Sequence, residues 1–142
     1  MQYHFRITRE PNGYWAECLE LDGCSTEGNT VDELERNAKE ALDLYLQEPE
    51  DSSLTLPLPD ESDGREENVI AVAVDPRIAL AVLLRHYRGK HHYTQKQMAQ
   101  RLNMNNLYSY QRLERRSNPR LETLQKLKCV FPDLSIDYLL QE

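Results

Sequence analysis

The segment from residue 94 to residue 127 constrains the fold more than any other part of this chain, because it carries several short amphipathic patterns separated by turn signals. Thr94 and Gln97 have the spacing of a capping box, which predicts the start of a first helix. Its apolar residues recur at helical spacing; they are Met98, Ala99 and Leu102. Asn103 then stands where a left-handed residue would end the helix, a conformation that Asn tolerates better than most residues.

A second amphipathic helix is predicted to begin near Asn105. Its apolar face would consist of Leu107, Tyr110 and Leu113, which follow one another at intervals of three. Its opposite face would carry Asn106, Ser109, Arg112 and Arg116. Side chains of these types can hydrogen-bond to base edges in the major groove of DNA, so this face is a candidate for nucleic-acid recognition.

Asn118 and Pro119 predict the start of a third helix, with Asn as its cap and Pro in its first turn. Its apolar stripe would be Leu121, Leu124 and Leu127. Two helices joined by a tight turn and covered by a third form the helix-turn-helix plan. The segment resembles lambda-repressor or Xre-like DNA-binding domains in Thr94-Gln95, in Arg112-Leu113-Glu114 and in the Asn-Pro-x-Leu-x-x-Leu run. It departs from them in a turn that is one residue longer, with Asn103 where Gly is common. A helical bundle with no nucleic-acid role is the alternative interpretation.

Candidate DNA contacts follow from this plan. Gln95, at the N-terminus of the first helix, can touch a phosphate with the help of the helix dipole. The candidates for contact with base edges are Asn106, Tyr108, Ser109, Gln111 and Arg112. The candidates for phosphate contact are Lys96, Arg115 and Arg116. Because one such domain binds weakly, we expect a homodimer or a higher homo-oligomer that reads two half-sites ~34 Å apart.

The two halves of the chain carry opposite charge. Residues 1–75 hold 5 basic and 19 acidic residues, a net charge of −14, whereas residues 76–142 hold 12 basic and 5 acidic residues, a net charge of +7. The basic half suits phosphate contact. The acidic half suits a basic protein partner, with plain solubility as the alternative explanation. The chain is long enough for two small domains, and we place their boundary between residues 75 and 76.

Composition also argues against several classes of protein. No apolar run is long enough to span a bilayer and Met1 does not begin a signal-peptide pattern, so we expect a cytoplasmic protein that is not in a membrane. The 3 cysteines, Cys18, Cys24 and Cys129, show no Cys-x-x-Cys spacing, which predicts reduced thiols, no metal site and no cofactor. We interpret Cys18 and Cys129 as buried structural thiols.

The first half shows the patterns of a small sheet and a helix. Strands are predicted for residues 2–8 and 14–19, which alternate in polarity, with a hairpin turn at residues 11–13 and a short third strand at residues 25–27. Thr30 and Glu33 form a second capping box before a helix that Pro49 would end. The stripe that packs on the sheet would be Val31, Leu34, Ala38, Ala41, Leu42 and Tyr45.

The middle of the chain is harder to interpret. The acidic segment 49–68 has linker composition, but Leu54, Leu56 and Leu58 alternate within it, so it is either an extended piece that packs or binds, or a flexible linker. Residues 69–74 are apolar throughout and predict a central strand. Asp75 would cap the next helix, whose residues 78–84 are apolar on nearly every side; we expect burial all round, with a subunit contact as the alternative. The His91-His92 pair favours an inert loop or a phosphate contact over a metal site.

Three motifs follow one another in the first half: Gly13-Tyr14-Trp15-Ala16, Leu21-Asp22-Gly23-Cys24-Ser25-Thr26-Glu27-Gly28 and Thr30-Val31-Asp32-Glu33-Leu34. Together they resemble the HicB antitoxins over about residues 1–75. Members often carry a C-terminal DNA-binding domain, so the resemblance extends over nearly all of the chain. It implies an α+β chain: a small antiparallel sheet with a helix, akin to a partial RNase H fold, followed by an all-α helix-turn-helix domain.

The resemblance also implies a function. The partner would be a HicA toxin, a small basic RNA-cleaving protein with a catalytic His, which the acidic half would occlude. The helical half would bind double-stranded operator DNA and repress the operon that encodes both proteins. Candidate toxin contacts are Glu17, Glu20, Asp22 and Glu27, which could equally form a solvated rim.

Two other functions are alternatives to this one. A stand-alone repressor whose first half senses a small ligand would need a defined apolar pocket. An RNase H-type nuclease would need carboxylates that converge on paired metal ions, and the acidic residues here are scattered over turns, linker and helix surface. The sequence therefore predicts that the chain is not an enzyme.

Overall fold

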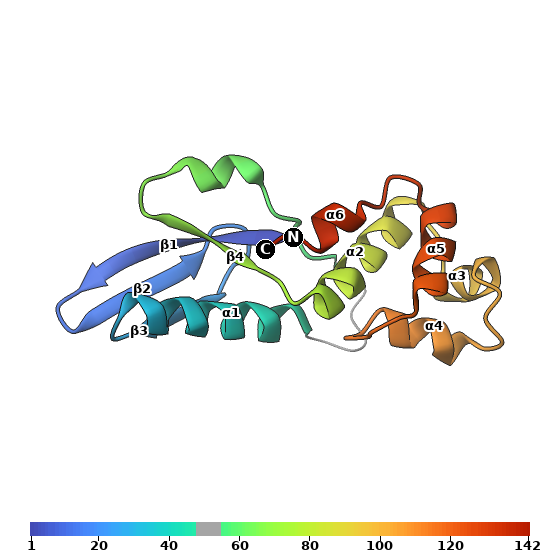
Figure 1. The fold of residues 1–142 in the computed structure, drawn as a ribbon, viewed down its shortest axis with the longest axis horizontal. Coiled ribbons are helices and arrows are strands. Elements are labelled where there is room, and N and C mark those ends of the chain that lie inside the picture. The colour runs from blue at the N-terminus through green and yellow to red at the C-terminus, as the bar shows by residue number, and fades with distance from the viewer. Residues whose placement is uncertain (48–54) are drawn as a thin grey trace.

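The computed structural model of the chain describes residues 1–47 and 55–142, and within them it has an α+β fold, as predicted (Figure 1). The strands are β1 (Gln2–Glu10), β2 (Gly13–Cys18), β3 (Ser25–Gly28) and β4 (Val69–Ala73). The helices are α1 (Val31–Gln47), α2 (Pro76–Lys90), α3 (Gln95–Arg101), α4 (Leu107–Leu113), α5 (Leu121–Val130) and α6 (Ile136–Leu139), with a 3-10 helix, η1 (Glu61–Arg65).

All strands belong to one antiparallel sheet with the order β3-β2-β1-β4. The predicted hairpin is confirmed, since β1 pairs with β2 from Phe5↔Cys18 to Glu10↔Gly13. Alternation directs Tyr3 and Phe5 to the face that α1 covers, where both are fully buried. On the opposite face, η1 partly covers the sheet. Its Gly64 lies so close to the ring of His4 that an added Cβ would be only 3.0 Å from it.

Helix α1 packs on the sheet through a line of side chains spaced by four residues: Leu34, Ala38, Leu42 and Leu46. Its N-terminus is capped as predicted, because Thr30 Oγ1 accepts from the Glu33 N–H at 3.1 Å, although the Glu33 carboxylate accepts from the N–H of Asn29 rather than that of Thr30. The prediction that Val31 belongs to the buried stripe is wrong. The helix approaches β3 at Leu34, where Gly28 leaves no space for a Cβ, and Val31 lies one turn before this contact.

Strand β4 lies at the edge of the sheet, so the prediction of a central strand is wrong. The sequence of residues 69–74 is apolar throughout, which suggested burial on both faces. Ala71 is exposed, however, and only the face that carries Val72 is turned to the core. In the preceding segment, Leu56 and Leu58 pack against the core and Tyr3 Oη donates to the Pro57 carbonyl at 2.9 Å, which confirms a packed piece there. The predicted helix end at Pro49 and the predicted contact of Leu54 lie outside the described residues.

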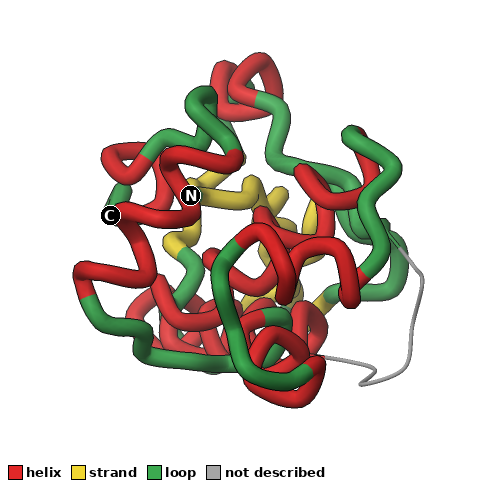
Figure 2. The backbone as a smooth tube through the Cα atoms, turned by 90° about the vertical axis from the view of Figure 1, so that its right-hand side faces the viewer, coloured by secondary structure: helices red, strands yellow, loops and turns green. Residues whose placement is uncertain are grey.

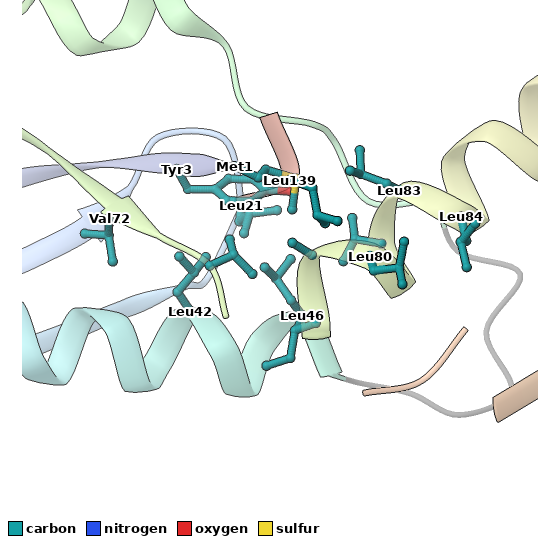
Figure 3. Close-up of a cluster of buried hydrophobic side chains, with 14 of the residues drawn as sticks. Met1, Tyr3, Leu21, Leu42, Leu46, Val72, Leu80, Leu83, Leu84 and Leu139 are labelled. Carbon is teal, nitrogen blue, oxygen red and sulfur yellow. The ribbon is translucent and has the colours of Figure 1, made fainter. Parts of the chain in front are cut away.

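Helix α2 joins the two halves of the molecule. Asp75 caps it, as predicted, and residues 78–84 are all buried. One continuous cluster of apolar side chains runs from the sheet and α1 across α2 to Leu139 of α6 (Figure 3). The N-terminal amino group of Met1 donates to the carbonyl of Tyr138, and both termini lie side by side at this junction (Figures 1 and 2). The predicted boundary after residue 75 therefore separates two regions of opposite charge whose buried apolar side chains belong to one cluster.

Helix α5 begins later than predicted. Asn118 and Pro119 remain outside it, and Arg120 takes the N-cap position with extended backbone angles and no side-chain cap hydrogen bond. Leu127 is buried, but Leu121 is 84% exposed, so its assignment to the apolar stripe is wrong. Cys129 is exposed on this helix, which corrects its interpretation as a buried thiol.

Candidate functional site

Two short helices, α3 and α4, pack against each other in the segment where the sequence predicts a helix-turn-helix pair (Figure 1). The capping box at Thr94 is complete, because its Oγ1 accepts from the Gln97 N–H at 3.0 Å and Gln97 Oε1 accepts from the Thr94 N–H at 2.8 Å. Asn103 ends the first helix with φ +54°, as predicted. Helix α4 buries Tyr110 and Leu113 against the core. Leu107 is exposed, which corrects its placement on that face.

A buried carboxylate, Glu114, fixes α4 against α2 and α3. Its side chain is 4% exposed and pairs with the Arg88 guanidinium. It also accepts from Tyr110 Oη at 2.8 Å and from Gln95 Nε2 at 2.7 Å, while its backbone carbonyl accepts from Arg85 at 2.6 Å and 3.0 Å. Burial raises the pKa of Tyr110, which keeps the hydroxyl as a donor. The sequence places an Arg-Leu-Glu run here, but composition gave no sign that Glu114 would be interior.

Gln95 and Gln111 face each other between α3 and α4. Gln111 Nε2 donates to Gln95 Oε1 at 3.1 Å, and Gln95 in turn donates to Glu114. Both glutamines are half-buried. These two predicted DNA contacts therefore also hold the helix pair together, and they orient the exposed surface of α4.

Asn106 is the N-cap of α4. Its Oδ1 accepts from the Ser109 N–H at 2.8 Å and from Ser109 Oγ at 3.0 Å. Two of the predicted base contacts are thus linked to each other at the start of the helix, where they shape its N-terminus. Asn106 is exposed and Ser109 is half-buried, so neither lies in the interior.

The remaining candidates form the basic surface, which we define as Lys96, Tyr108, Arg112, Arg115 and Arg116. All of them are exposed. The Arg112 guanidinium lies 5.9 Å from the centre of the Tyr108 ring. The three arginines also line one side of a shallow depression that is completed by Ser109, Ser117 and Asn118. Two of the predicted phosphate contacts, Arg115 and Arg116, thus lie beside Arg112, whereas Lys96 is on α3 and does not line this depression.

Asp75 connects the basic surface to the junction between the halves. Its carboxylate accepts from Arg77 at 2.7 Å and from Arg116 at 3.3 Å, and its backbone N–H donates to Asp43 of α1 at 3.1 Å. Hydrogen bonds from Arg77, with a further contribution from the charge of Arg116, lower the pKa of Asp75 to about 2. One residue therefore links α1, the start of α2 and an arginine of the basic surface.

Asp75→Asn is expected to make stability less sensitive to acid. A depressed carboxyl pKa stabilises the folded state fully above the unfolded value of 3.8, and this contribution is lost as the pH falls toward about 2. Asn keeps the oxygen that caps α2, so the variant should lose only the stabilisation that comes from the charge of Asp75. At neutral pH the free energy of unfolding of the wild type should exceed that of the variant by up to about 2 kcal/mol, and this difference should shrink as the pH falls. Urea unfolding of both proteins from neutral pH to about pH 3 measures this difference in stability. The control is Asp133→Asn, because Asp133 is an exposed acid that pairs with Lys90. A difference in the free energy of unfolding that does not change with pH would contradict a lowered pKa of Asp75 in the folded state.

The predicted partner contacts of the acidic half divide into two kinds. Glu17, Asp22 and Glu27 are exposed. Glu20 is not, because its carboxylate is 4% exposed and accepts from the His4 backbone N–H at 2.8 Å and pairs with His4 Nδ1 at 3.0 Å. Glu20 is therefore an internal partner of His4 and cannot serve as a surface contact in this conformation. Sequence alternation placed His4 on the outer face of β1 and gave no sign of its cover by η1.

The remaining predictions concern the His91-His92 pair, metal sites and membrane spans. His91 and His92 are exposed after α2, and His92 has φ +57°. Within residues 1–47 and 55–142, no group of His, Cys, Asp or Glu side chains has the arrangement of a metal site. Over the same residues, none of the helices combines the length and apolar character needed to cross a membrane.

Part of this chain is similar in sequence to a known protein. A stretch of 40 residues, 28% of this chain, is 45% identical to a protein of Helicobacter pylori (strain J99) that is named UPF0150 protein. The match spans 56% of the length of that relative. No protein-family model matches the chain.

Proposed function

We propose that this chain is a HicB-like antitoxin of a type II toxin-antitoxin system and that it also represses its own operon. The acidic half binds a HicA-like mRNA-cleaving toxin and covers its active surface. The helical half binds double-stranded operator DNA. In this proposal the chain acts by binding and does not catalyse a reaction.

The observation that carries the DNA-binding part is the exposed basic surface on a rigidly held helix pair. Arg112, Arg115 and Arg116 are at the surface of the α3–α4 unit, while Glu114 and the glutamine pair fix the orientation of α4 from within. A helix presented in this way suits the major groove, and flanking arginines suit phosphates. The net charge of +7 for residues 76–142 supports the same role.

The toxin-binding part is supported by charge and by resemblance. Residues 1–75 carry a net charge of −14, and Glu17, Asp22 and Glu27 are exposed on β2, β3 and the turn between them. Such a surface complements a small basic protein and speeds its association. The motifs around Gly13, Gly23 and Thr30 resemble HicB antitoxins, and the similarity to the UPF0150 protein is in keeping with this family.

Co-expression with the product of the neighbouring gene tests the toxin-binding part. We expect a stable complex in a pull-down and loss of RNA cleavage when the chain is added to the toxin. The combined variant Glu17→Gln, Asp22→Asn and Glu27→Gln should weaken the complex, whereas Glu35→Gln, an exposed acid on α1, should not. Absence of a complex, or undiminished cleavage, would refute the antitoxin function and favour a stand-alone repressor that senses a ligand.

Arg112→Ala is expected to weaken binding to the preferred duplex by about 1–3 kcal/mol and to relax discrimination at one base position. Arg115→Ala should instead weaken binding to all duplexes alike and reduce the salt slope by about one. Lys126→Ala is the control, because Lys126 is an exposed cation of α5 paired with Glu122 outside the basic surface. Fluorescence anisotropy on labelled duplexes at several salt concentrations measures all three. Equal effects of Arg112→Ala on specific and scrambled duplexes would contradict a base contact.

A further inference from the structure

Cys18 and Cys24 lie directly opposite each other at the end of the β2–β3 ladder. The last registered pair is Glu17↔Ser25, and one step further along the antiparallel strands places Cys18 across from Cys24. The Cys18 N–H donates to the Cys24 carbonyl at 2.8 Å, which confirms this register. Directly opposed residues of an antiparallel ladder point to the same face, with Cα atoms ~4.5–5.5 Å apart. That separation lies within the range that a disulfide spans.

The two thiols also interact with each other. Both are buried, at 8% and 3% exposure. Hydrogen bonding from the Cys18 thiol to the Cys24 sulfur raises the pKa of Cys18 and lowers that of Cys24. Cys18 Sγ also lies 3.9 Å from Glu20 Oε1, so this carboxylate is a second acceptor for the same proton. The geometry thus places two thiols opposite each other, with a carboxylate oxygen of Glu20 beside Cys18.

We propose that Cys18 and Cys24 form a reversible intramolecular disulfide, so that this pair is a redox modification site of the chain. With a peroxide as oxidant, the Cys24 thiolate attacks one oxygen, forms a sulfenic acid and releases hydroxide. The Cys18 sulfur then attacks the Cys24 sulfur and displaces its hydroxyl group, which leaves as water with the Cys18 proton. The proton that Cys24 lost when it became a thiolate neutralises the hydroxide released in the first step. The net products are one disulfide and two waters from two thiols and one peroxide.

Local structure favours closure of this bond. Gly23 has φ +80°, which supplies the left-handed residue that the turn between the cysteines needs, and the Cys24 N–H donates to the Leu21 carbonyl at 3.2 Å. These contacts hold the backbones of Cys18 and Cys24 next to each other across the turn. The bond would close the turn that carries Asp22, one of the exposed acidic residues, so oxidation would reduce the freedom of that edge. This inference is independent of toxin and DNA binding.

The test uses the full chain with Cys129→Ser, because Cys129 is exposed and would otherwise form intermolecular disulfides. The folded protein is treated with hydrogen peroxide, then with a thiol-alkylating reagent, and its intact mass and non-reducing peptide map are recorded. We expect both remaining thiols to disappear, a mass lower by two hydrogens, a cross-linked peptide joining Cys18 to Cys24, and full reversal by a dithiol reductant.

Two further variants distinguish the roles of the thiols. In the Cys129→Ser background, Cys18→Ser should accumulate a sulfenic acid on Cys24 that a dimedone probe captures, whereas Cys24→Ser should give much less adduct. If circular dichroism shows that a variant does not fold, the peptide map of the Cys129→Ser protein still shows whether the disulfide between Cys18 and Cys24 forms. Retention of both thiols in the folded protein, under conditions where the urea-unfolded protein forms the cross-link, would overturn the proposal.

Discussion

Glu114→Ala is expected to lower the free energy of unfolding by about 3–5 kcal/mol, the range observed when one partner of a buried ion pair is removed. Glu114 is 4% exposed, and its loss leaves the Arg88 guanidinium without its carboxylate in a largely buried site. It also removes the acceptor of Tyr110 and Gln95. Since Gln95 in turn orients Gln111, the variant should lose DNA affinity at temperatures where it remains folded.

The matched control is Glu122→Ala, which makes the same substitution on the exposed first turn of α5. Glu122 pairs with Lys126 at 3.7 Å at the surface, and such pairs contribute only about 0–1 kcal/mol. Urea unfolding of the two variants and the wild type, followed by duplex binding at a temperature where all three are folded, gives both readouts. Similar losses for Glu114→Ala and Glu122→Ala would show that the buried network does not hold α4 in place.

Leu46→Ala is the second change with a large expected effect, about 2–5 kcal/mol of stability. Leu46 is fully buried at the end of α1, where it lies beside Ile78 and Ala81 of α2. Because the apolar cluster continues from the sheet through α2 (Figure 3), we expect the loss to be felt by both halves of the molecule. The two halves should unfold in one transition in the wild type and in the variant.

Two probes can follow the halves separately. Trp15 is the only tryptophan and reports on β2, and a fluorophore attached to the exposed Cys129 reports on α5. Leu44→Ala is the control, because Leu44 is on the same helix but 60% exposed, and its loss should cost less than about 0.5 kcal/mol. Two separate midpoints, with only the Trp15 signal shifted by Leu46→Ala, would show that the halves are independent domains.

Local sequence patterns predicted much of this fold because they reflect local physics. Alternation located β1 and β2, and the Thr94–Gln97 capping box and the left-handed Asn103 defined the limits of α3. The buried stretch 78–84 of α2 also followed from its composition. In each case the pattern that indicates the structure lies within a few positions along the chain.

The errors arose where distant contacts decide. An apolar run does not say how many neighbours a strand has, so β4 was expected at the centre of the sheet. Glu20 and Glu114 look like ordinary surface acids until the fold brings His4 and Arg88 to them. The start of α5 was misplaced because Asn118-Pro119 is compatible with both a helix start and an extended approach to one.

The charge division has a structural counterpart at Asp75. This carboxylate of the acidic half binds Arg116 of the basic surface, so the two charge regions touch at the start of α2. A DNA phosphate that engages Arg116 would compete with Asp75.

The central claim is that the helical half binds a duplex through the α4 surface. The most direct test is a salt-dependent anisotropy titration of the unmodified chain with the duplex upstream of its own gene and with a scrambled duplex. We expect tighter binding to the upstream duplex, a linear fall of log affinity with log salt concentration, and a weaker preference for the upstream duplex in Arg112→Ala. A wild-type chain that fails to bind either duplex at low salt would contradict it.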